Sequence, residues 1–233
     1  MRSKTSHGFV TFGDELLSTS WQGNFRLSPV KPKPWLPYIL PFAIYALFLA
    51  VQSPQNVVWI YPLKTIAVAL ALIFFWRHYD ELRPARFSSL AVLVGLMAIV
   101  IWIGIDRYYP KWASAEIFDA SGKPVFIAFR VTGAVVVVPL MEELFWRAFL
   151  IRWLVAPDFK RVPVGTFTWS SFAITVVLFG LEHDAWLAGM ICGALYNWLY
   201  YKRKSIFACV VAHAVSNAAL AGWVLARGDW KFW

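Results

Sequence analysis

Charged residues are scarce in this sequence. Only 15% of its 233 residues are Asp, Glu, Lys or Arg, whereas 60% are hydrophobic and 18% are aromatic. A soluble domain usually carries about 25% charged residues. The composition therefore excludes an ordinary soluble protein and predicts an all-α, polytopic bundle of transmembrane helices.

Several kinds of site are also missing. The two cysteines, Cys192 and Cys209, lie inside apolar stretches, so they predict buried thiols and no disulfide framework. There is no Cys-x-x-Cys pair, no Gly-rich phosphate loop and no His-Glu-x-x-His helix. The formal net charge of +9 comes from short basic clusters between apolar runs. This pattern is typical of membrane topology, so we expect the bilayer and no nucleic acid as a partner.

The first 34 residues lack the apolar core of a secretory signal peptide. They end in Ser-Pro-Val-Lys-Pro-Lys-Pro, which cannot continue a helix. We therefore expect a polar cytoplasmic tail over 1–34 and a transmembrane helical domain over 35–233.

Seven apolar runs follow, each near the ~20 residues that cross a bilayer core. They lie at about 35–51, 57–76, 87–105, 125–153, 167–183, 185–201 and 206–226. The fourth is too long for one straight span, so it tilts, extends beyond the bilayer or kinks at Pro139. A break there would add an eighth crossing.

The loop charges predict the orientation. With the N-terminus in the cytoplasm, 14 Lys and Arg residues lie in the inner segments and five in the outer ones. We therefore expect a bacterial inner (plasma) membrane protein with a cytoplasmic N-terminus. Lys64 and Arg130 lie within apolar runs, close enough to span ends for their side chains to reach the membrane surface.

The fourth run carries three ionisable residues, Glu142, Glu143 and Arg147. A charged side chain deep in a bilayer costs roughly 2.5–3.5 kcal/mol on insertion scales, so such a cluster indicates a functional site. Glu143 and Arg147 are four residues apart, which predicts an ion pair on one helix face. Glu142 then points elsewhere and is available for chemistry or a ligand. The alternative is a buried structural cluster of all three.

Two further spans supply polar partners. The fifth run ends Phe179-Gly-Leu-Glu-His183, and the seventh holds His213 and Asn217 four residues apart. Counted from the 154–166 loop, Glu142 and His183 lie about 13 and 16 residues away, which puts them at a similar depth. His213 lies only about 8 residues from the 202–204 loop, so it joins them only if the helices tilt or are staggered.

These residue types fit one chemistry. A carboxylate and a histidine around a water provide a general base, and a second histidine beside an amide provides donors for an oxyanion. Together they describe amide hydrolysis without a nucleophilic side chain.

The three ordered motifs resemble those of the CAAX-protease and bacteriocin-processing family of intramembrane proteases, which includes the Ras-converting endopeptidase. They are Glu142-Glu143-x-x-x-Arg147, Phe179-x-x-x-His183 and His213-x-x-x-Asn217, within about 125–226. The resemblance implies that Glu142 and His183 activate water and that His213 and Asn217 form an oxyanion hole. It implies that Glu143 and Arg147 support the site, and that the enzyme is glutamic-type with no cofactor.

The resemblance also implies a membrane-associated peptide or protein substrate. Prenylated proteins are a eukaryotic substrate class, and this compact chain looks bacterial, so we expect another membrane-associated or lipidated peptide. The Trp-rich spans are loosely similar to bacterial members encoded with exosortase systems.

Two other hypotheses remain open. In the first, Glu142, His183 and His213 bind a catalytic zinc ion. In the second, the chain is a non-catalytic membrane protein such as a scaffold or immunity factor. A transporter would show broken helices at matching positions in two halves.

Overall fold

The computed structural model describes residues 33–82, 88–112 and 117–233. Nearly all of the predicted tail over 1–34 lies outside these residues. The described residues form helices joined by short connections and contain no strand. The expected all-α bundle of membrane helices is therefore confirmed.

Seven helical segments match the seven predicted apolar runs to within a few residues. They are α1 (Leu36–Val51), α2 (Val57–Phe74), α3 (Ser89–Ile105), a composite segment over 124–153, α7 (Trp169–Leu181), α8 (Trp186–Arg203) and α9 (Ile206–Arg227). Four stretches are long and apolar enough to cross a membrane, namely Val57–Phe74, Ser89–Tyr108, Pro124–Trp153 and Ile206–Arg227. The helices α1 and α7 are apolar but shorter.

The composite segment is the long fourth run of the sequence. It consists of α4 (Pro124–Thr132), a π-helical stretch (Gly133–Val137), α5 (Val138–Glu143), a second π-helical stretch (Leu144–Leu150) and α6 (Ile151–Trp153). Pro139 lies directly after the first π-helical stretch, inside the continuous segment, where it removes one backbone N–H donor. The segment is helical throughout, so the break required for an eighth crossing does not occur.

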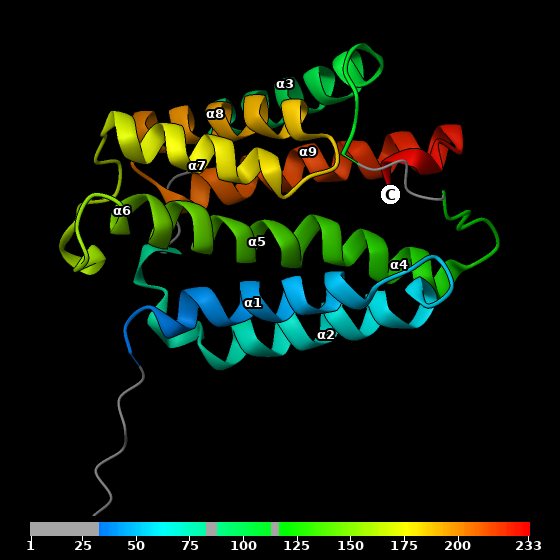
Figure 1. The fold of residues 1–233 in the computed structure, drawn as a ribbon, viewed down its shortest axis with the longest axis horizontal. Coiled ribbons are helices and arrows are strands. Elements are labelled where there is room, and N and C mark those ends of the chain that lie inside the picture. The colour runs from blue at the N-terminus through cyan, green and yellow to red at the C-terminus, as the bar shows by residue number, and fades with distance from the viewer. Residues whose placement is uncertain (1–32, 83–87, 113–116) are drawn as a thin grey trace, which may run out of the picture. The chain divides into compact units, whose positions relative to one another are not determined.

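The composite segment lies between two groups of helices (Figure 1). On one side are α1 and α2, which pack on each other; on the other are the α7–α8 hairpin, α9 and α3. One close approach in the second group is between α3 and α9. A Cβ atom on Gly95 would lie 2.3 Å from the Ala212 carbonyl oxygen, so only glycine permits this contact.

One end of the bundle is joined by a buried ionic cluster around Glu81. Its carboxylate accepts hydrogen bonds from Arg152 Nη1 at 2.7 Å and from the Tyr38 hydroxyl at 2.8 Å, and Lys160 Nζ lies 3.3 Å away. Burial raises the pKa of Glu81, but the Arg152 hydrogen bond and the Lys160 charge outweigh it and hold the pKa below its usual value. The cluster joins the start of α1 to two connections that the charge count assigns to the cytoplasm.

The prediction that Lys64 reaches the membrane surface is wrong. Its side chain is buried, Nζ donates to Gln52 Oε1 at 2.9 Å, and the ammonium group lies 4.6 Å from the ring centroids of Tyr45 and Tyr61. Arg130 also turns inward, with its guanidinium 4.6 Å from the Tyr61 centroid. Aromatic faces contact both cations, and an amide also contacts Lys64, in place of the water expected at the membrane surface.

Candidate active site

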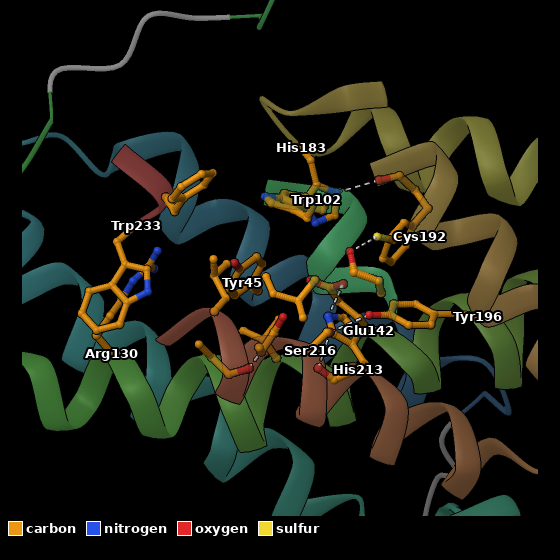
Figure 2. Close-up of a pocket in the computed structure, with 18 of the residues that line it drawn as sticks. Tyr45, Trp102, Arg130, Glu142, His183, Cys192, Tyr196, His213, Ser216 and Trp233 are labelled. Carbon is orange, nitrogen blue, oxygen red and sulfur yellow. Dashed lines mark hydrogen bonds and ion pairs between the residues drawn. The ribbon is translucent and has the colours of Figure 1, made fainter. Parts of the chain in front are cut away.

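A cavity of about 180 Å³ lies inside the bundle (Figure 2). Its wall includes Glu142, His183, His213 and Asn217, the four residues that the sequence singles out for catalysis. Glu142 comes from α5, His183 follows α7, and the other two come from α9. Tertiary packing thus brings three separate motifs to one cavity.

Glu143 and Arg147 form the expected i, i+4 ion pair. Arg147 Nη1 lies 3.0 Å from Glu143 Oε1, and the side chains are 1% and 0% exposed. Arg147 also donates to Asn197 Oδ1 at 3.2 Å and to the Gly193 carbonyl at 3.4 Å. Its guanidinium lies 4.5 Å from the ring centroid of Phe179. These contacts tie the composite segment to α7 and α8.

His213 contacts both carboxylates of the first motif. Its Nδ1 lies 3.0 Å from Glu143 Oε1, and its Nε2 lies 3.9 Å from Glu142 Oε2. An ionised carboxylate only accepts hydrogen bonds, so Nδ1 carries a proton. The ring stacks on Tyr196, with centroids 5.2 Å apart.

The depth mismatch expected for His213 is small in the structure. The composite segment ends at Trp153 and α9 begins at Ile206. Glu142 therefore lies about 11 residues, and His213 about 7 residues, from those helix ends, which is a difference of about 6 Å in rise. Side chains bridge this distance.

Glu142 is the carboxylate without a committed partner. It is 4% exposed, and its Oε2 atom makes no hydrogen bond to the described residues. A buried polar atom without a partner is costly and marks a position for a ligand or a water. This agrees with the division of labour inferred from helical spacing, in which Glu143 pairs with Arg147 and Glu142 does not.

His183 is held in a defined orientation just beyond α7. Its Nδ1 lies 2.7 Å from the Phe179 carbonyl oxygen, which can only accept, so Nδ1 carries the proton. In the neutral ring, Nε2 is then the basic nitrogen. The ring also meets Trp102 edge-to-face, with centroids 5.4 Å apart.

Asn217 uses its amide group to join α9 to the composite segment. Its Nδ2 donates to the Ala134 carbonyl at 2.8 Å. An amide nitrogen has two hydrogens, so this bond fixes the side chain and leaves one hydrogen for a ligand in the cavity.

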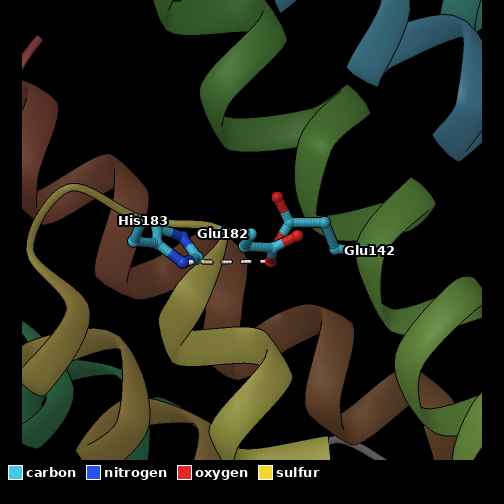
Figure 3. Close-up of side chains that lie close together, drawn as sticks. All are labelled: Glu142, Glu182 and His183. Atoms are coloured by element: carbon cyan, nitrogen blue, oxygen red, sulfur yellow. Dashed lines mark ion pairs between the residues drawn. The ribbon is translucent and has the colours of Figure 1, made fainter. Parts of the chain in front are cut away.

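Glu182 is a site residue that the sequence reasoning missed. One oxygen of Glu142, one oxygen of Glu182 and one ring nitrogen of His183 all lie within 4.8 Å of one another (Figure 3). Glu182 Oε1 also accepts a hydrogen bond from Trp146 Nε1 at 3.1 Å. The sequence places Glu182 directly before His183. Helical spacing could not give the direction of the Glu182 side chain, because α7 ends at Leu181.

The same three residues are the group whose ligand atoms lie close enough together to hold a metal ion, within the part of the chain that the structure describes. His213, which the zinc hypothesis includes, is not in this group. Its Nδ1 is instead engaged by Glu143.

Residues 124–219 match the model of the Rce1-like family of type II CAAX prenyl endopeptidases. This match supports the CAAX-protease family for the motif-bearing part of the chain. The matched range contains all of the motif residues from Glu142 to Asn217. The match supports, in general terms, a CAAX-type intramembrane endopeptidase, which is a hydrolase. No curated protein and no solved structure matches the chain.

Proposed function

We propose that this CAAX-type protease is a glutamic-type endopeptidase that cleaves a membrane-associated or lipidated peptide. The observation that carries the proposal is Glu142. It is a buried carboxylate with an unpartnered oxygen, and it lines the same cavity as His183, His213 and Asn217. These are the groups that water-mediated amide hydrolysis requires.

The geometry supports a distinct role for each group. Glu142 takes a proton from the attacking water, and the basic nitrogen of His183 assists it. The free hydrogen on the Asn217 amide is available to an oxyanion. His213 can donate from Nε2 only when its ring is doubly protonated, because Nδ1 already donates to Glu143. Glu143 and Arg147 position this histidine.

The cavity wall favours an apolar substrate segment. Beyond the polar motif residues, it contains aromatic and aliphatic side chains, including Tyr45, Ile99, Trp102 and Leu220. Arg130 and Trp233 lie at the end of the cavity away from Glu142 (Figure 2). A peptide that already lies in the bilayer, or carries a lipid, would enter such a cavity without exposing apolar surface to water.

We further propose a bacterial inner membrane with the N-terminus in the cytoplasm. The segments assigned to the inside meet at the Glu81 cluster, and the opposite end is joined by Asp106, with Lys111 and Lys231 Nζ each at 3.0 Å. Trp102 and Arg130 line the cavity near helix ends at this opposite end. In this orientation, substrates reach the cavity from the bilayer or from the non-cytoplasmic side.

Purified protein in detergent tests the proposed activity with a fluorogenic S-farnesyl-cysteine peptide and, as a second probe, its non-prenylated counterpart. We expect Glu142→Gln and His183→Ala each to lower kcat by about 10²–10⁴-fold, while the thermal unfolding midpoint stays near that of the wild type. His78→Ala is the matched histidine control, because His78 is exposed and lies outside the cavity wall.

Two results would contradict the proposal. If Glu142→Gln abolishes folding, the buried carboxylates form a structural cluster. If zinc is present in stoichiometric amount and activity disappears on chelation and returns with zinc, the enzyme is a metalloprotease.

A further inference from the structure

Glu182 lies directly beside the proposed catalytic carboxylate (Figure 3). It follows α7, and its Oε1 atom is fixed by the hydrogen bond from Trp146 Nε1 at 3.1 Å. Trp146 is itself buried against Phe42 and Phe179. The buried indole of Trp146 therefore holds the Glu182 carboxylate in one position.

The distances define a position for one small ligand. The three atoms of Glu142, Glu182 and His183 lie within 4.8 Å of one another. For any three points this close, some position lies within about 2.8 Å of all of them, which is an ordinary hydrogen-bond distance. A single water molecule can therefore contact all three groups.

An independent observation concerns the same carboxylate. Glu142 is more than nine-tenths buried, and its Oε2 atom makes no hydrogen bond within the described residues. A water held by Glu182 and His183 would give the buried Glu142 carboxylate a hydrogen-bond partner. The charged and titratable groups that face Glu142 from the other elements are His213 on α9, Tyr45 on α1, and Glu182 and His183 just after α7.

We propose that Glu182 is a third residue that holds the attacking water, beside Glu142 and His183. This rests on the proposed endopeptidase activity. A water has two hydrogens, and the two carboxylates can accept one each, so His183 then contacts the water but accepts no hydrogen from it. The lone pairs of the water then point away from both carboxylates and are available to a substrate carbonyl carbon.

The reaction balances with no further reagent. The water oxygen bonds to the carbonyl carbon while one of its protons passes to Glu142. Glu142 then gives this proton to the leaving nitrogen as the C–N bond breaks. Glu182 keeps its hydrogen bond to the second hydrogen, which remains on the product carboxyl group.

Three variants test this role in the full-length protein with the farnesylated fluorogenic peptide. We expect Glu182→Ala to lower kcat by at least about 100-fold with little change in KM. Glu182→Gln, which keeps one acceptor oxygen, should retain more activity than Glu182→Ala. Asp184→Asn is the matched acid-to-amide control on the same turn and should keep the wild-type kcat.

Trp146→Phe separates this role from a general structural one. It removes the donor to Glu182 and keeps an aromatic ring for packing. We expect a smaller loss of kcat than in Glu182→Ala, and no additional loss when Trp146→Phe is combined with Glu182→Ala, because both changes act through one contact. Additive losses, or an unchanged kcat in Glu182→Ala, would overturn the proposal.

A readout without substrate distinguishes failure of this inference from failure of the proposed function. A high-resolution structure of the wild type should contain a water within hydrogen-bond distance of all three groups, and Glu182→Ala should lose it. If the wild type cleaves the peptide but no such water is present, Glu182 does not hold it. If the wild type cleaves neither probe, the proposed function fails whatever the water shows.

Discussion

His213 Nδ1 lies 3.0 Å from Glu143 Oε1, and Arg147 Nη1 donates a hydrogen bond to the same oxygen at 3.0 Å. One buried carboxylate oxygen thus orients a cavity histidine while it neutralises an arginine. Helical spacing predicts only the pairing of Glu143 with Arg147. The contact also fixes which nitrogen of His213 faces Glu142, so Glu143 acts on the site through the position of that ring.

Removal of this carboxylate should destabilise the fold as well as the site. Glu143→Gln leaves the guanidinium of Arg147 buried without a counter-ion, and breaking one partner of a buried pair costs about 3–5 kcal/mol. We expect a loss of that order in the free energy of unfolding in detergent, together with a lower kcat. In a double-mutant cycle, Arg147→Gln should lower the free energy of unfolding by less in the Glu143→Gln variant than in the wild type. Strict additivity would contradict the pairing.

The Glu81 cluster predicts acid sensitivity. The pKa of Glu81 is lowered in the folded state, because the Arg152 hydrogen bond and the Lys160 charge outweigh the effect of burial. Its stabilising contribution is therefore fully present above the unfolded value of about 4.3 and is lost as pH falls through the lower folded value. We expect the gap in thermal midpoint between wild type and Glu81→Gln to be constant from pH 7 to about pH 5 and to close toward pH 3. A gap that does not change with pH would contradict this.

The contact between α3 and α9 predicts a sharp difference between two glycines of one helix. A methyl group on Gly95 would meet the Ala212 carbonyl oxygen at 2.3 Å, whereas one on Gly104 meets nothing within 4 Å. We expect Gly95→Ala to destabilise the protein by about 1–3 kcal/mol, as overpacking usually does. Gly104→Ala is the control and should be neutral or stabilising by up to about 1 kcal/mol. Equal thermal midpoints would mean that the two helices do not pack this closely.

The proposed orientation can be tested by cysteine labelling in intact cells. Ser121 and Asp158 are exposed residues in connections at opposite ends of the bundle, and both native cysteines are buried. With the N-terminus in the cytoplasm, Ser121→Cys should react with a membrane-impermeant maleimide, and Asp158→Cys should react only after lysis. The reverse pattern would place the basic connections outside and invert the orientation.

The fold and the local pairs follow from the sequence because they depend on short-range geometry. Apolar run length predicts the seven helical segments, since a helix must satisfy its own backbone in a bilayer. The i, i+4 spacing predicts the Glu143–Arg147 pair, and similar residue counts predict a shared depth for Glu142 and His183. The family match supports the interpretation of the three motifs as those of a CAAX-type protease. The exosortase-associated subgroup stays a prediction.

Tertiary structure decided the contacts that helical geometry cannot direct. Glu182 follows the end of α7, where only packing against Trp146 determines where its side chain points. His213 meets Glu143 because their side chains span the difference in distance from the two helix ends. Lys64 turns inward because the rings of Tyr45 and Tyr61 surround it. Sequence periodicity gives the face of a helix, and only the packed bundle determines which atoms that face meets.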